Sequence, residues 1–163
     1  MKVKDVMMRT PASCTAETNL GTAVEILWNR NCGILPVVNA QQQVVGVVTD
    51  RDVCIALVTR NRLAGEITVG EVASGKVSTC KPDDDVRAAL ATMAHAHVRR
   101  LPVLNADGKL EGILSMDDIV AHSEARVPGK TTELSDDDVV DTLKVLYRGE
   151  LLELAPRKTT LIA

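Results

Sequence analysis

The chain has 163 residues and a formal net charge of −3, so it lacks the basic excess of proteins that bind nucleic acids or anionic membranes. No apolar stretch reaches the roughly 18 residues of a membrane-spanning helix, and Asp5 stands where a signal peptide would have its apolar core. Aromatic residues make up only 1% of the chain, which argues against stacking of single-stranded nucleic acid. We therefore predict a cytoplasmic globular protein with an aliphatic core.

The first 60 residues predict alternating helices and strands. Thr10–Ser13 is expected to be extended, because Pro11 disfavours helix in the residue before it. A helix capped by Thr18 or Asn19 is expected to run to about residue 30 and to end at Gly33. The remaining predicted elements are a helical turn at 3–7, strands at 14–15, 34–38 and 44–49, a turn at 39–43, and a helix at 50–60.

The same order returns 66 residues later, since Gly46 matches Gly112 and the Leu-Pro-Val run at Leu35 matches the one at Leu101. The predicted elements are a turn at 69–73, strands at 77–80, 100–104 and 109–115, a hairpin turn at 105–108, and helices at 83–96 and 116–124. We therefore predict an α+β protein with two β-α-β-β-α repeats related by a pseudo-twofold axis, repeat 1 at 1–62 and repeat 2 at 63–124.

Residues 125–163 fall outside the repeat and form a predicted tail with one amphipathic helix. A break is expected at 127–129, and Ser135 with Asp138 is typical of a helix cap. The apolar helix that follows is expected to stop at Gly149, with Leu151, Leu152 and Leu154 after it and no clear pattern from Pro156 onward. A helix this apolar needs a partner, either its own repeat or a second copy across a dimer interface.

One motif occurs in both repeats: Gly, two aliphatic residues, a hydroxyl residue, two further residues and Asp. It places Thr49 and Asp52, and again Ser115 and Asp118, where a strand gives way to a helix. The spacing favours a capping box that only satisfies the first N–H groups of the helix. It also favours an anion-attracting helix terminus with a carboxylate able to accept the hydroxyls of a ribose. The two interpretations are compatible.

With these motifs, the Val-Lys-Asp-Val-Met opening and the Leu-Pro-Val strands, residues 2–124 resemble a tandem CBS-domain pair, also called a Bateman module. The resemblance implies two repeats packed through their sheets, with clefts that bind AMP, ADP, ATP or S-adenosylmethionine as regulatory ligands. It also implies a homodimer, commonly disc-like, that acts on an unidentified effector protein. We expect a stand-alone regulatory module that is not an enzyme and requires no cofactor.

The resemblance also implies roles for individual residues. Asp52 and Asp118 would accept the ribose, and Thr49 and Ser115 would contact ribose or phosphate. Ile34 and Arg100 would line the clefts. Backbone groups of the extended segments would contact the base, and the residues concerned are Ala12, Ser13, Ser78 and Thr79.

The residue types themselves point to Arg51, Arg99 and Arg100 as cations for phosphate groups. Solvent-exposed ion pairs with the many nearby Asp residues are the alternative for these arginines.

Two other functions compete with ligand binding. For an enzyme, His95 and His97 are the candidate bases or metal ligands, but at i and i+2 of a helix they point to different sides. The four cysteines lie far apart in the sequence, so we expect buried small side chains and no metal site. The second competitor is a protein-interaction or dimerisation module without a small-molecule ligand, in which the Thr49/Asp52 and Ser115/Asp118 pairs are only caps.

Overall fold

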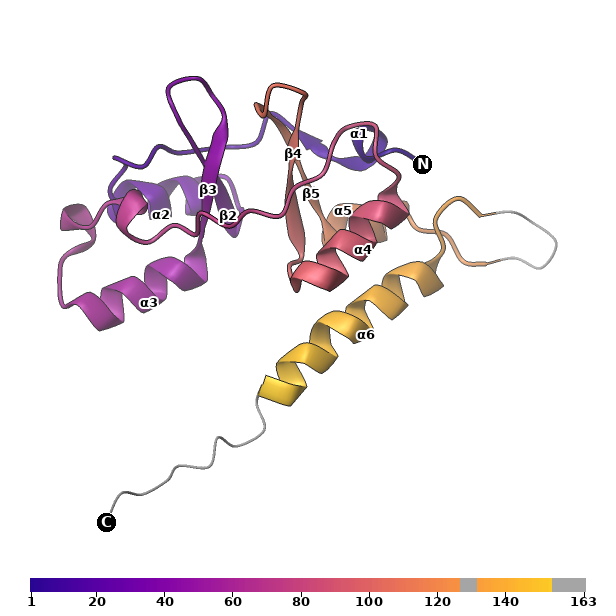
Figure 1. Ribbon diagram of the computed structural model, residues 1–163. Helices are drawn as coiled ribbons and strands as arrows, with labels where there is room; N and C mark the ends of the chain where they lie inside the picture. The colour runs from indigo at the N-terminus through magenta and orange to yellow at the C-terminus, as the bar shows by residue number, and fades with distance from the viewer. Residues whose placement is uncertain (127–131, 154–163) are drawn as a thin grey trace, which may run out of the picture.

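The computed structural model describes residues 1–126 and 132–153, with side chains described up to residue 148. It confirms the α+β class with two repeats and a C-terminal helix (Figure 1). Repeat 1 contains α2 (Leu20–Asn29), β2 (Ile34–Val38), β3 (Val44–Thr49) and α3 (Asp50–Arg60). Repeat 2 contains α4 (Val86–Ala96), β4 (Arg100–Leu104), β5 (Leu110–Ser115) and α5 (Met116–His122). The remaining elements are α1 (Val3–Val6), β1 (Met8–Arg9), the 3-10 turns η1 (Ala64–Glu66) and η2 (Val69–Glu71), and α6 (Asp136–Glu153).

The two repeats share one backbone design. Ile34 pairs with Thr49 in repeat 1, and Arg100 pairs with Ser115 in repeat 2. Each hairpin also has its register shift at the equivalent place, after Val37 and after Val103. The predicted strands of both hairpins therefore have the expected residues and the expected register, 66 positions apart.

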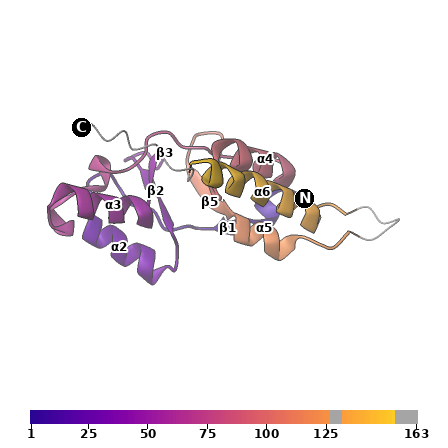
Figure 2. The same ribbon diagram turned by 90° about the horizontal axis from the view of Figure 1, so that it is seen from below.

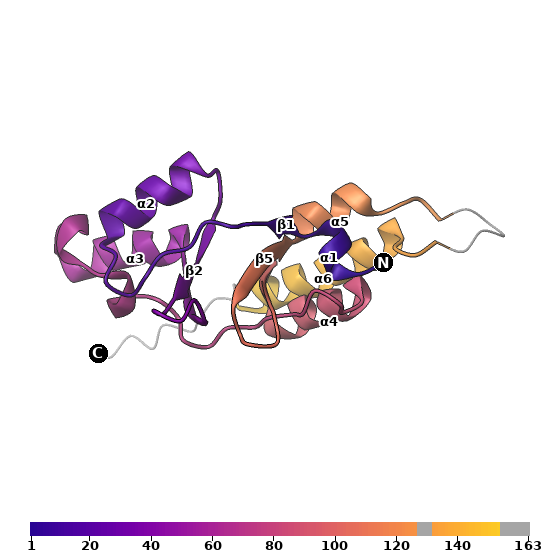
Figure 3. The ribbon, with the colours of Figure 1, turned by 90° about the horizontal axis from the view of Figure 1, so that it is seen from above.

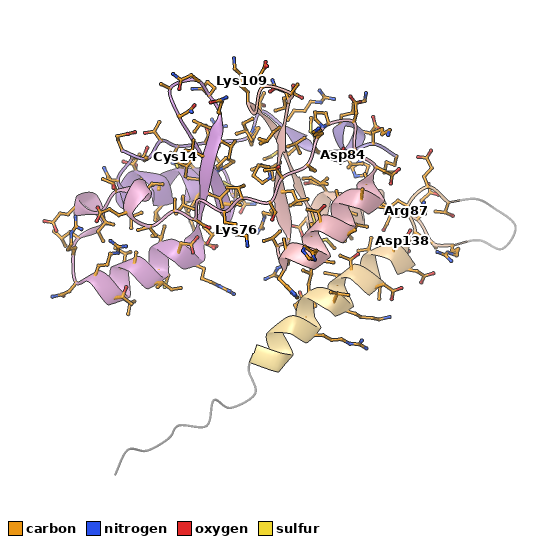
Figure 4. The ribbon with its side chains drawn as sticks, in the orientation of Figure 1. Cys14, Lys76, Asp84, Arg87, Lys109 and Asp138 are labelled. Carbon is orange, nitrogen blue, oxygen red and sulfur yellow. The ribbon has the colours of Figure 1, made fainter. Side chains whose placement is uncertain are left out.

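The first residues of each repeat pack into the core of the other repeat. Val3 is fully buried among the residues of repeat 2, and its N–H donates to the carbonyl of Asp84 (3.0 Å; Asp84 is labelled in Figure 4). Ile67 and Val69 are fully buried in the core of repeat 1. Figure 3 shows the chain running from α1 past β5 before it enters repeat 1. Each structural core contains residues from both sequence repeats. The boundaries 1–62, 63–124 and 125–163 therefore stay a prediction about the sequence repeats.

This exchange explains the glycine that opens each repeated motif. Met8 pairs with Ile113 of β5, and the equivalent residue Ser74 pairs with Val47 of β3. A Cβ at Gly112 would lie 2.7 Å from Met7 Sδ and 2.8 Å from the carbonyl oxygen of Met8. A Cβ at Gly46 would lie 3.0 Å from the carbonyl oxygen of Ser74. The glycines thus let the exchanged segments approach the strands closely.

The sheets of the two repeats meet at the middle of the molecule. Leu35 and Val37 point into the core of repeat 1, so Ile34, Pro36 and Val38 lie on the opposite face of the hairpin. The hairpin loops touch, because Gln43 Nε2 donates to the carbonyl of Asp107 (3.0 Å) beside Lys109, which Figure 4 labels at the hairpin tip of repeat 2. The ends of the two hairpins therefore lie against each other.

Helix α6 packs on its own chain. It contacts α4 and α5, and Val139 of α6 is buried in the core of repeat 2 (Figure 2). Arg87 of α4 pairs with Asp138 of α6 at 3.1 Å (Figure 4). Of the two predicted partners for this helix, a repeat of its own chain or a second copy, the face of α6 that carries Val139 packs on repeat 2 of its own chain.

Several predicted boundaries were wrong. Helix α4 begins at Val86 with Asp85 as its cap, because the Asp85 carboxylate accepts the N–H of Arg87 (2.9 Å). Helix α2 ends at Asn29, within one residue of the predicted end, but the residue that adopts the left-handed backbone after it is Asn31 (φ 47°) and not Gly33. Helix α5 ends at His122, before the predicted residue 124.

Three further expectations also need correction. Helix α6 continues past Gly149 to Glu153, because one glycine weakens a helix without ending it. The predicted strands at 14–15 and 77–80 are single bridges, of Cys14 with Val37 and Cys80 with Val103. The predicted break at 127–129, Leu154 and the residues from Pro156 onward lie outside the described residues.

Candidate functional site

Both repeated motifs form capping boxes. Asp52 Oδ2 accepts the backbone N–H of Thr49 (2.9 Å) and its hydroxyl (2.7 Å), and Thr49 Oγ1 accepts the N–H of Asp52 (3.2 Å). Asp118 Oδ2 and Ser115 make the same three bonds at 2.9, 2.6 and 3.2 Å. The capping interpretation is thus confirmed for both motifs.

Capping does not use the whole carboxylate. In both boxes one oxygen, Oδ2, accepts both bonds, so Oδ1 of Asp52 and of Asp118 has no hydrogen bond within the described ranges. Ser135 and Asp138 form a third box with bonds of 3.0, 2.8 and 3.3 Å at the start of α6, where Asp138 also pairs with Arg87. In this third box too, Oδ2 of Asp138 accepts every bond, including those from Arg87, so neither the spacing nor a free Oδ1 by itself defines a ligand site. Asp52 and Asp118 differ from Asp138 in that each follows the second strand of a repeat hairpin.

Asp52 is one of the residues that line a pocket of about 190 Å³ between α3 and the end of η2. The pocket is smaller than the about 300–1,000 Å³ that encloses a drug-sized ligand, so it can hold part of a nucleoside and not all of it. Its far end is fixed by Glu71, which pairs with Arg60 (3.2 Å) and Arg62 (2.8 Å). The Thr68 backbone N–H, and after it the Arg62 guanidinium, lower the pKa of the Glu71 carboxyl, so this end of the pocket stays ionised.

Arg100 brings a cation from repeat 2 to the start of α3. A Cβ built on Gly33 would lie 3.5 Å from Arg100 Nη1 and 3.4 Å from Asp50 Oδ2, so the guanidinium lies over the bare backbone of Gly33. Arg100 is half-buried and has no hydrogen bond or ion pair with any described residue. The structure thus places Arg100 and the Thr49/Asp52 box at the same end of α3.

The other two predicted cations do not reach between the repeats. Arg99 Nη1 is 3.5 Å from the hydroxyl of Tyr147 on α6, and its guanidinium carbon is 5.8 Å from the centre of that ring. Arg51 is exposed on the first turn of α3. Arg99 therefore joins repeat 2 to α6, and Arg100 is the arginine that reaches between the repeats.

The predicted wall residues lie on the two segments that cross between the repeats. Ala12 and Ser13 lead into Cys14, whose N–H donates to the carbonyl of Pro36 (3.0 Å). Ser78 and Thr79 lead into Cys80 in the same way, beside Pro102 (3.1 Å). All four wall residues are half-buried. Their contact with a base stays a prediction.

The cysteines are free and differ in burial. Burial raises the pKa of the Cys14 thiol to about 11 and that of Cys80 to about 12, so both stay protonated at neutral pH. Cys32 is half-buried and Cys54 is exposed, which corrects the expectation that all four are buried. The residues that the structure describes contain no group of three side chains suited to a metal ion.

Sequence reasoning missed three features of this region. The space over Gly33 follows from the contact between repeats, so the sequence offered no signal for it. The contact of Tyr147 with Arg99 depends on the path of α6, although a lone Tyr in an aromatic-poor chain was a hint. The pocket wall at Glu71 and Val72 arises from the segment exchange, which repeat matching alone does not reveal.

The architecture is that of a two-repeat α+β module, in which each repeat completes the other and each presents a capped Asp at a helix start. The chain belongs to the CBS domain family, which is matched twice, at residues 3–59 and 69–125. This confirms the tandem CBS pair. Among the described helices none is both long and apolar enough to cross a membrane.

Known proteins of this kind include ligand complexes. The CBS domain pair of protein MJ0100, crystallised with 5′-methylthioadenosine and S-adenosyl-L-methionine, has a TM-score of 0.68 and 25% identity, covering 74% of this chain and 94% of that chain. CBSX2 in complex with AMP has a TM-score of 0.64 and 26% identity, covering 74% and 93%. Protein MK0525 of Methanopyrus kandleri is 33% identical over 102 residues, which are 61% of this chain and 52% of that relative. The match thus spans about half of the Methanopyrus protein.

Proposed function

We propose that this protein is a regulatory module that binds an adenosine-containing ligand, AMP, ADP, ATP or S-adenosylmethionine, between its two repeats. The observation that carries the proposal is the pair of capped carboxylates, each with one oxygen free of hydrogen bonds and each at the same register position of its repeat. Similar CBS pairs are complexed with AMP, 5′-methylthioadenosine or S-adenosyl-L-methionine, which supports the adenosine class.

In this proposal the ribose hydroxyls donate to Oδ1 of Asp52 or Asp118, while Oδ2 keeps the helix cap. Thr49 or Ser115 lies beside the ribose, and the wall segments offer backbone groups to the base. Binding bridges the two repeats and shifts their packing, and an effector protein in the cytoplasm senses the shift. The module regulates and does not itself catalyse a reaction.

The first test is a thermal-shift panel of AMP, ADP, ATP, S-adenosylmethionine and NAD, with guanosine nucleotides as controls. A ligand at 100 times its Kd stabilises the folded state by about 2.7 kcal/mol. Titration calorimetry then measures affinities for Asp52→Asn and Asp118→Asn, in which the amide oxygen can still accept a cap bond. Loss of one ribose acceptor is expected to weaken binding by about 1–3 kcal/mol.

The matched control is Asp138→Asn, because Asp138 forms the same box outside both repeats. This variant is expected to lose stability but not affinity. An adenosine ligand whose affinity is unchanged in both Asp52→Asn and Asp118→Asn would show that the motif assignment is wrong. A flat panel would instead favour a protein-interaction module without a small-molecule ligand.

We also propose a homodimer in which α2 and α3 of repeat 1 meet the same helices of a second copy. Support comes from exposed apolar side chains on this helix pair, with Trp28 84%, Val58 79% and Ile55 54% exposed. The equivalent pair α4 and α5 lies under α6 (Figure 2), so in each copy the surface left for an isologous contact is on repeat 1.

Trp28 is the single tryptophan of the chain, so its fluorescence reports on this surface alone. A dimer predicts a blue-shifted emission that moves to the red on dilution, in step with a fall in mass by analytical ultracentrifugation. Trp28→Glu and Val58→Glu are expected to give monomers that keep the helix content of the wild type. A wild-type protein that stays monomeric at high concentration would contradict the proposal.

A further inference from the structure

The two Asp sites have the same backbone but different charges around them. At three equivalent positions the site of Asp52 and the site of Asp118 differ in residue type, and these pairs are Asp50 and Met116, Arg51 and Asp117, and Arg100 and Ile34. At these positions the Asp52 site has two cations and one additional carboxylate. The Asp118 site has one additional carboxylate and no cation.

Of these residues, Arg100 is the one whose side chain extends from one repeat to the other. Its strand position faces away from Leu101 and Val103, which point into the core of repeat 2, and its guanidinium reaches Gly33 of repeat 1. No described residue pairs with it, although it is half-buried. A partly buried guanidinium without an acceptor is costly, and its planar set of N–H groups matches the oxygens of a phosphate.

The Asp118 site has an apolar residue where the Asp52 site has this arginine. Ile34 pairs with Thr49 as Arg100 pairs with Ser115, and it is only 8% exposed, yet it is absent from the core cluster of its own repeat. Its burial therefore comes from the side that faces repeat 2. Arg99, the nearest cation in sequence, lies against Tyr147 of α6. Beside Asp117 and Asp118, a phosphate would meet like charge and an apolar wall.

From these contacts we infer that the two sites select different ligands. The Asp52 site takes a 5′-phosphorylated adenosine such as AMP, with Arg100 on the phosphate. The Asp118 site takes an adenosine whose 5′ substituent is apolar and carries no negative charge, such as a thioether, beside Ile34. This division of ligands rests on the proposed adenosine-binding function and makes Arg100 the residue that determines phosphate specificity.

The test is titration calorimetry of the full chain with AMP, adenosine and 5′-methylthioadenosine. Arg100→Gln removes the guanidinium, and Arg100→Ile installs the residue of the other site. Both are expected to weaken AMP by about tenfold to a hundredfold, the range for loss of a charge-assisted hydrogen bond. Adenosine affinity is expected to change by less than about twofold, since it lacks the phosphate that the arginine contacts. Lys144→Gln is the control for net charge, because Lys144 is exposed on α6 and pairs with Asp141.

A second titration assigns the sites. Asp52→Asn is expected to weaken AMP and Asp118→Asn to weaken 5′-methylthioadenosine, and the two ligands are expected to bind wild-type protein together. If Arg100→Gln weakens AMP and adenosine equally, or if AMP depends on Asp118 alone, the division is wrong while the proposed function stands. If none of the three ligands binds, the proposed function fails and the division fails with it.

Discussion

Repeat 1 and repeat 2 differ most in what covers their helices. Val24 of α2 and Leu90 of α4 occupy equivalent positions, yet Val24 is 41% exposed and Leu90 is 3% exposed. The difference lies in α6, which crosses α4 and α5 and adds Val139 to the core of repeat 2 (Figures 1 and 2). An apolar helix position inside a repeat therefore becomes a core position only when a later element covers it.

Truncating this equivalent pair is expected to have the largest effect on stability. Leu90→Ala should cost about 2–5 kcal/mol in the free energy of unfolding, because it leaves a cavity in a closed core. Val24→Ala should cost about 1 kcal/mol or less in the monomer, because its side chain already contacts solvent. Urea unfolding followed by circular dichroism measures both. A cost for Val24→Ala that approaches that of Leu90→Ala, and grows with protein concentration, would mean that a second copy covers α2.

The repeats also differ in how closely the exchanged segment approaches the strand beside it. Gly112→Ala is expected to cost about 1–3 kcal/mol, because its Cβ would overlap both Met7 and the backbone of Met8. Gly46→Ala is expected to cost less, since its nearest neighbour is at 3.0 Å. Thermal unfolding of the two variants measures the difference. Equal costs would contradict the prediction that the segment beside Gly112 is packed more tightly than the segment beside Gly46.

The attachment of α6 to repeat 2 should depend on pH through Asp138. The Ser135 N–H, then the Ser135 hydroxyl and Arg87, lower the pKa of the Asp138 carboxyl against the opposing effect of burial. A lowered folded-state pKa stabilises the fold above the unfolded value of about 3.9, and this stabilisation is lost as the pH falls through the folded-state pKa.

Asp138→Asn is expected to cost about 0.5–2 kcal/mol at pH 7 and to flatten the acid side of the stability curve. Urea unfolding from pH 7 down to about pH 2, a window that extends well below the unfolded-state value of about 3.9, follows the effect. The control is Asp137→Asn, since the Asp137 side chain is 69% exposed and should leave the curve unchanged. An unchanged acid limb in Asp138→Asn would rule out this origin of the pH dependence.

The smallest effect is expected at the other end of α6. Tyr147→Ala removes the ring beneath Arg99 and should cost about 0.5–1 kcal/mol, whereas Tyr147→Phe keeps the ring and should cost less. A double-mutant cycle with Arg99→Ala isolates the pair. A coupling energy of zero would show that Tyr147 and Arg99 are neighbours without attraction.

Part of the candidate site could be predicted from local sequence alone. The Thr49/Asp52 and Ser115/Asp118 boxes follow from hydrogen bonds over three residues, and the strands before them follow from apolar runs between turn residues. Arg100 was identified as a cation near the ligand, but its place over Gly33 was not, because that contact joins residues 67 positions apart in sequence.

The sequence by itself determined the two repeats, their 66-residue offset, both hairpins and all three Ser/Thr-x-x-Asp caps, because these depend on neighbours a few residues apart and on the alternation of apolar positions. Only the tertiary structure decided that the opening segments are exchanged, that α6 covers α4 and α5 but not α2 and α3, and that the Arg100 side chain reaches Gly33 of repeat 1. These features depend on contacts between segments far apart in the sequence. Because the two repeats have nearly the same sequence pattern, that pattern is compatible with more than one set of such contacts.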